Sequence, residues 1–184
     1  MFKKITVLVA AFVLVLSQVA FAVAKTPEAS MSPSELPETI NSFELFWPIA
    51  PGKTMGDSLY FLKTLKENAR GMIIFGNPEK ADYKVLLATK RLVEAEKLIT
   101  ENKEDLANKT LNSAVNNLEA AQNAVSSAVE NKDDFQGNGQ TLSDKLKNID
   151  LFARWLASKN EGKYESLKII SEKAVQTSNR LEGK

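Results

Sequence analysis

The residues that could bind phosphate stand in one short segment, Gly52-Lys53-Thr54, which matches the end of a phosphate-binding loop. The complete loop needs a glycine five residues before Gly52, where Trp47 stands, and no strand is expected before it. We therefore expect a turn at this segment rather than a nucleotide site.

Two groups of oxygen-bearing side chains could bind a metal ion. Residues 134–139 are spaced like the first half of a calcium loop, but Lys145 stands where that loop requires a bidentate glutamate. Glu94 and Glu96 lie on one predicted helix, but di-metal helical bundles also need histidine, which the chain lacks. We expect neither a metal site nor a cofactor.

The composition removes most catalytic designs. The 184 residues include no cysteine and no histidine, which excludes thiol catalysis, Cys-ligated zinc, a lipid-modified N-terminal cysteine and Ser-His-Asp triads. Carboxylate or lysine catalysis would remain. The 24 basic and 23 acidic side chains leave a net charge of +1, which gives no reason to expect nucleic-acid binding. The sequence predicts that the protein is not an enzyme.

The first 24 residues form a predicted export segment. Two lysines precede an uninterrupted apolar run over residues 5–16, and small residues follow it. One interpretation is a signal peptide cleaved after Ala22 or Ala24. The other is a retained membrane anchor, because residues 5–24 are just long enough to cross a bilayer. In both cases the rest of the chain lies outside the cytoplasm, either secreted or anchored to the cell membrane.

A linker and an aromatic segment precede the predicted helices. Residues 25–41 hold three prolines among Ser, Thr and Glu, as is typical of linkers, so the predicted helical domain spans residues 42–184. At its start lies an apolar strap without helical spacing: Phe43, Phe46, Trp47 and Ile49. The strap either packs on the helices or forms an exposed partner site. If it packs, Trp47→Ala should destabilise the domain by ~3 kcal/mol or more.

Hydrophobic periodicity predicts an all-α fold, an antiparallel helical bundle of three long helices after a short first one. Asp57 is the expected N-cap of the first helix, which ends near Phe75 because Gly76-Asn77-Pro78 breaks it. The apolar stripe of this helix is Leu59, Leu62, Leu65, Ala69 and either Met72 or Ile73.

The second and third helices share a seven-residue repeat. Apolar positions alternate by four and three from Ala81 to Ile99 and again from Ala107 to Ala128. A polar loop separates them from the last helical region, residues 141–182, where the same phase continues across Gly162. We interpret this region as one long helix, with two helices split at Gly162 as the alternative.

The second helix also carries many charges. Its basic residues are interleaved with acidic ones: Lys80, Lys84, Lys90, Arg91 and Lys97 with Asp82, Glu94 and Glu96. This mixture favours a solvated face with intrahelical ion pairs. An anionic wall polymer or lipid surface is the alternative partner of such a face.

Four motifs follow one another within residues 48–98: Pro51-Gly52, LYFLK at 59–63, Lys80-Ala81 and ATKRLVEA at 88–95. In this order they resemble a bacterial family of exported domains of unknown function. The resemblance implies a bacterial, extracytoplasmic helical domain and brings no catalytic residues.

These observations predict a non-enzymatic interaction or structural module of the cell envelope. Its partner would be an envelope protein, a polymer or another copy of the chain, and residues 5–24 would contact the membrane if they are retained. The alternative is a tethered, extracytoplasmic ligand-binding or sensory domain, because helical bundles can hold ligands between their helices.

Overall fold

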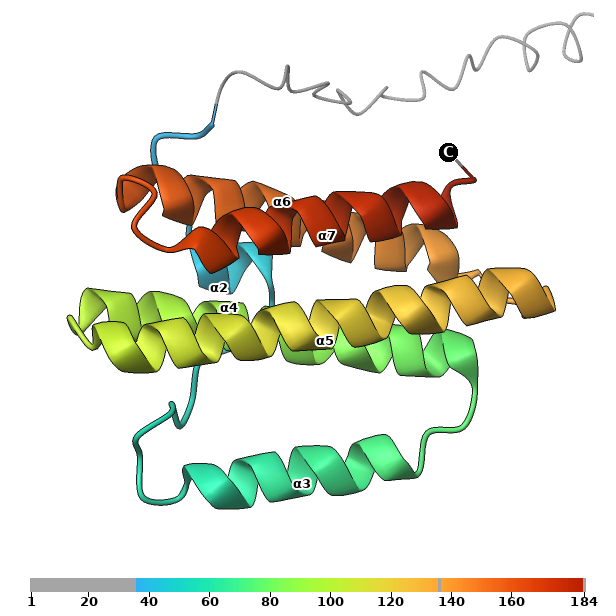
Figure 1. Ribbon diagram of the computed structural model, residues 1–184, viewed down its shortest axis with the longest axis horizontal. Helices are drawn as coiled ribbons and strands as arrows, with labels where there is room; N and C mark the ends of the chain where they lie inside the picture. The colour runs from blue at the N-terminus through green and yellow to red at the C-terminus, as the bar shows by residue number, and fades with distance from the viewer. Residues whose placement is uncertain (1–35, 136, 184) are drawn as a thin grey trace, which may run out of the picture. The chain divides into compact units, whose positions relative to one another are not determined.

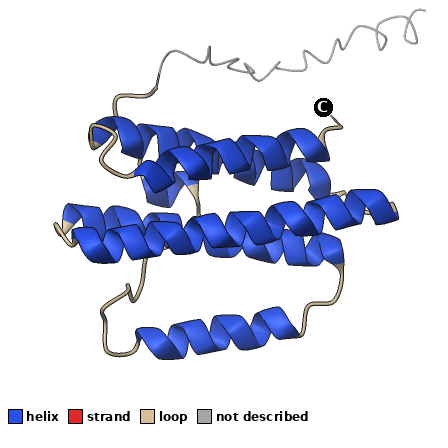
Figure 2. Cartoon of the chain, viewed as in Figure 1, coloured by secondary structure: helices blue, strands red, loops and turns tan. Residues whose placement is uncertain are grey.

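The computed structural model describes residues 36–135 and 137–183, which form one compact unit beginning at Leu36. Its helices are α2 (Ser42–Leu45), α3 (Tyr60–Met72), α4 (Asn77–Thr100), α5 (Glu104–Asn131), α6 (Asn138–Lys159) and α7 (Glu165–Leu181). These residues contain no strand (Figure 2), so the all-α prediction is confirmed. None of the helices described here is both long and apolar enough to cross a bilayer. The predicted export segment lies outside the described residues.

Helices α4 to α7 form a four-helix bundle in which α4 packs on α5 and α6, and α7 packs on the same two helices (Figure 1). The seven-residue repeat of α4 and α5 is confirmed, because Leu92 and Leu118 are fully buried at its apolar positions. Ala88 and Ala114 are buried at neighbouring positions of the repeat. Their small side chains let the helix backbones approach closely, and this pair of helices forms the most extensive contact in the bundle.

The bundle contains two antiparallel hairpins, α4–α5 and α6–α7. Where the hairpins meet, however, α5 and α7 run parallel. Lys173 pairs with Glu119 at 3.0 Å and Gln122 donates a hydrogen bond to Gln176 at 3.3 Å, so residues ascending along one helix meet residues ascending along the other. The predicted antiparallel order therefore describes neighbours joined by short turns and not every pair of packed helices.

The interpretation of residues 141–182 as one long helix is wrong, since α6 ends at Lys159 and α7 begins at Glu165. Gly162 has φ +72°, a left-handed conformation that glycine adopts without steric cost, and Glu161 is left-handed as well at φ 51°. The chain reverses there, giving four long helices in the bundle instead of three. The apolar phase persists because Leu156 and Leu167, on either side of the turn, point into the same core.

The start of α3 also differs from the prediction. Its N-cap position is Leu59, not Asp57. The Asp57 carboxylate instead accepts a hydrogen bond of 2.7 Å from the backbone N–H of Thr54, which closes the turn before the helix, and this bond lowers the pKa of Asp57. Gly52, two residues before this turn, has φ +56°, and the Gly52-Lys53-Thr54 segment bends at Lys53 as it leads into the turn before α3.

Candidate functional site

Helix α3 presents its apolar side to solvent and its polar side to the bundle. Leu65 is 61% exposed and Met72 is 80% exposed, although both belong to the stripe that a buried helix would turn inward. The same side continues past the helix to Phe75, which is 83% exposed. The α3 apolar face comprises Leu59, Phe61, Leu62, Leu65, Ala69, Met72, Ile73 and Phe75. The sequence predicted the helix and its stripe, but the direction that the stripe faces is the reverse of that expected for a core helix.

The polar side of α3 meets α4 through buried ion pairs. Glu67 pairs with Arg91 and, at 3.2 Å, with Lys90. Lys63 pairs with Glu94, which also accepts a hydrogen bond of 2.9 Å from Arg91. These five side chains, which we call the α3–α4 charge cluster, join two residues of α3 to three of α4.

Further polar contacts fix the position of α3. Lys63 Nζ donates to the backbone oxygen of Lys53 at 2.8 Å, which ties the Pro-Gly turn to the charge cluster. The Tyr83 hydroxyl donates to the backbone oxygen of Glu67 at 2.7 Å. The Arg91 guanidinium lies 5.6 Å from the centre of the Tyr60 ring, within the range of a cation–π contact. Helix α3 is thus held along its length by directed contacts.

Burial dominates the electrostatics of the charge cluster. It raises the pKa of Glu94, and hydrogen bonding by Lys63 and the charge of Arg91 only partly oppose this shift. Burial would lower the pKa of Arg91, but the charges of Glu94 and Glu67 outweigh it and raise the pKa. Burial also raises the pKa of Tyr60. The cluster therefore keeps Arg91 charged while the charged form of Glu94 is disfavoured.

The expectation that the charges of the second helix form a solvated face is wrong for Arg91 and Glu94, both of which are buried beneath α3. Tyr83, Leu87, Lys90, Arg91 and Glu94 recur at helical spacing, so they form a second side of α4 opposite its core side. Because this side is polar, it selects the polar side of α3. In the sequence, the helical spacing of Tyr60, Lys63 and Glu67 was the signal that α3 has a polar side matching that of α4.

The strap residues are divided between core and solvent. Phe46 is 7% exposed and packs edge-on against Phe152, with ring centres 5.4 Å apart. Ile49 is partly buried against the same core. Trp47, in contrast, is 69% exposed, and its ring meets that of Phe43, which is also exposed, at 4.8 Å. Residues Ser42–Leu45 form one helical turn, capped by the Asn41 side chain, where no helix was expected.

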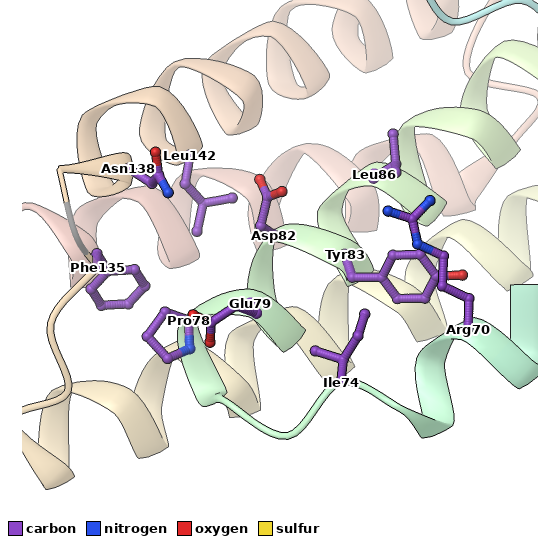
Figure 3. A pocket seen from close by; sticks show the side chains of 10 residues that line it. All are labelled: Arg70, Ile74, Pro78, Glu79, Asp82, Tyr83, Leu86, Phe135, Asn138 and Leu142. Atoms are coloured by element: carbon purple, nitrogen blue, oxygen red, sulfur yellow. The ribbon is translucent and has the colours of Figure 1, made fainter.

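A small cavity lies where the end of α3, the first turns of α4 and the start of α6 meet (Figure 3). Its volume is about 220 Å³, below the roughly 300–1,000 Å³ of pockets for drug-sized ligands. Tyr83 and Asp82 line it from α4, Arg70 from α3 and Asn138 from α6. The described residues contain no group of three or more acidic side chains placed to hold a metal ion.

A family model identifies the protein family to which the chain belongs. A model described as a domain of unknown function, DUF5667, covers residues 52–182. The chain belongs to the DUF5667 family. This agrees with the resemblance to a family of helical domains of unknown function. No curated protein and no solved structure matches the chain.

The DUF5667 match includes α3 but not the strap. Helix α3, the charge cluster and the whole bundle lie within residues 52–182, whereas Phe43, Phe46, Trp47 and Ile49 precede it. Helix α3 is therefore part of the DUF5667 domain, whereas the strap residues lie outside the matched range.

Proposed function

We propose that this DUF5667 protein is a non-enzymatic interaction module of the bacterial cell envelope and that the α3 apolar face is its binding surface. One observation carries the proposal: an amphipathic helix with its polar side buried and its apolar side in solvent. Contiguous exposed apolar surface of this kind marks binding sites in soluble domains.

The charge cluster supports this interpretation, because it gives α3 a reason to keep its orientation. If α3 turned over, Glu94 and Arg91 on α4 would lose Lys63 and Glu67 and face apolar side chains. Removing one partner of a buried ion pair costs several kcal/mol. The outward direction of the apolar side is therefore a built-in feature of the α3–α4 contact.

The location in the envelope rests on the predicted export segment. Lys3 and Lys4 before an apolar run, followed by Ala22 and Ala24, support export in either the cleaved or the anchored form. The mass of the chain purified from its host distinguishes the two forms.

Ligand binding by a tethered sensory domain is the second candidate. It is favoured by the cavity in Figure 3, where Asp82, Tyr83 and Arg70 bring polar groups to a partly apolar space. A small ion or metabolite fragment would fit its size.

Site-specific photo-crosslinking of the full chain in its host tests both candidates. A crosslinking amino acid replaces Leu65 on the apolar face, Asn138 at the cavity, or Lys168, whose exposed side chain lies on α7. We expect adducts at position 65 well above those at 138 and 168. Small-molecule adducts at 138 alone would favour ligand binding, and equal adducts at 65 and 168 would contradict the interaction module.

A further inference from the structure

Within residues 58–75, the exposed charges beside the α3 apolar face all have one sign. Lys66 and Arg70 are exposed beside it. The single carboxylate between residues 58 and 75 is Glu67, which is buried against Arg91. Any partner of this face therefore meets apolar side chains edged with positive charge.

We propose that the α3 apolar face binds the surface of an anionic phospholipid membrane, with α3 lying parallel to the bilayer plane. This inference rests on the proposed function and names its partner. Helices that lie in the membrane interface combine Leu and Phe on one side with Lys and Arg beside it, and they bury the apolar side about 5–10 Å into the headgroup region. Phe61, Leu65 and Lys66 provide this combination on α3.

The shape of the face fits a plane better than a pocket. Its side chains run in one strip from Leu59, before the helix, to Phe75, after it. The fractions exposed remain high to the end of the strip, at 70% for Ile73 and 83% for Phe75. A flat bilayer can cover the whole strip at once, including the part that continues beyond the helix.

A second copy of the chain fits this face less well. In a two-fold antiparallel contact between α3 helices, residues near the middle of Tyr60–Met72 meet their own copies. Lys66 lies at that midpoint, so the contact would bring two lysines together without a carboxylate on either face. Anionic lipid headgroups supply the missing negative charge.

The two cations beside the apolar face, Lys66 and Arg70, are not part of the charge cluster and can contact lipid headgroups. Glu67 and Glu94 form ion pairs with Lys63, Lys90 and Arg91 on the side of α3 that faces α4. Arg70 lies over the Tyr83 ring at 5.3 Å, with its side chain still exposed. The inner ion pairs thus hold α3 in place while the outer side contacts the membrane.

The chain contains no cysteine, so a single introduced cysteine carries a unique fluorescent label. The label is placed on Leu65→Cys or, as a matched control, on Lys168→Cys, whose side chain in the wild type is 80% exposed on α7. The full chain is reconstituted with vesicles of phosphatidylcholine alone or with phosphatidylglycerol added. Quenching by spin-labelled lipid reports contact with the bilayer.

We expect the label at position 65 to be quenched in the phosphatidylglycerol vesicles several-fold more than the label at 168. Lys66→Glu lowers the quenching at 65 several-fold, whereas Lys168→Glu, tested with the label at 65, leaves it unchanged. Equal quenching at 65 and 168, or equal quenching in both kinds of vesicle, overturns the lipid proposal. Protein adducts at 65 in the host without lipid contact would also overturn it, and would leave the interaction module standing.

Discussion

The bundle α4–α7 and helix α3 use the same amphipathic pattern in opposite ways. In the bundle, Leu92 and Leu118 are buried at the apolar positions of their helices. In α3, Leu62 and Leu65 meet water and Glu67 is buried. An apolar stripe therefore predicts that a helix will form and which residues share a side, but the partner surface determines which side is buried.

This difference separates stability from binding. Burying apolar side chains stabilises the bundle, whereas α3 is held by ion pairs whose desolvation offsets much of their attraction. The apolar surface of α3 makes little contribution to folding, so it is free to serve a partner.

The sharpest test is the same substitution in both regions. Leu92→Ala should lower the free energy of unfolding by about 3–5 kcal/mol, because the fully buried side chain leaves a cavity. Leu65→Ala should change it by less than about 0.5 kcal/mol, because that side chain is exposed. Urea unfolding followed by circular dichroism measures both. Similar losses in the two variants would mean that the apolar side of α3 is buried in the protein in solution.

The strap provides a second comparison within two adjacent residues. Phe46→Ala should cost about 2–3 kcal/mol, since it removes the ring packed on Phe152 at the edge of the core. Trp47→Ala should cost less than about 1 kcal/mol, well below the value expected for a packed tryptophan, because the ring is mostly exposed. Thermal unfolding of the two variants decides the order. A larger loss for Trp47→Ala would show that the strap packs through its tryptophan.

The sequence predicted burial best where a residue's environment depends only on its own helix and one neighbouring helix with the same repeat. The repeat in α4 and α5 predicted buried positions such as Val85 and Leu111, because two helices with the same repeat bury each other's stripes. The split at Gly162 was only the alternative interpretation because the apolar phase continued through it, and phase alone does not distinguish a straight helix from a reversal within one core.

The orientation of α3 depended on a side of α4 that carries charge. Arg91 and Glu94 look like solvent-facing residues until a second helix supplies Glu67 and Lys63. Opposite charges on two helices can pair across a contact or remain in water, and helical spacing is the same in both cases. Periodicity therefore predicts the helix but not its rotation about its own axis.

The pH dependence of Glu94 tests whether burial or ion pairing governs the α3–α4 contact. Burial raises the pKa of Glu94 in the folded protein above its value in the unfolded chain. Between these two pKa values the folded state binds more protons, so its stability rises as the pH falls. Each unit of difference between the two pKa values corresponds to about 1.4 kcal/mol. Relative to Glu94→Gln, the wild type should therefore become more stable as the pH is lowered from 7 toward the unfolded pKa of glutamate.

Urea unfolding of both proteins across this pH range measures the difference, in which the other carboxylates largely cancel. Lys63→Met sharpens the test, because it removes a cation that lowers the pKa of Glu94 and should move the change to higher pH. If the wild type instead loses stability relative to Glu94→Gln on acidification, Lys63 and Arg91 outweigh burial. In that case α3 is held by ion pairing strong enough to keep Glu94 charged, and its attachment to α4 should weaken in acid instead of tightening.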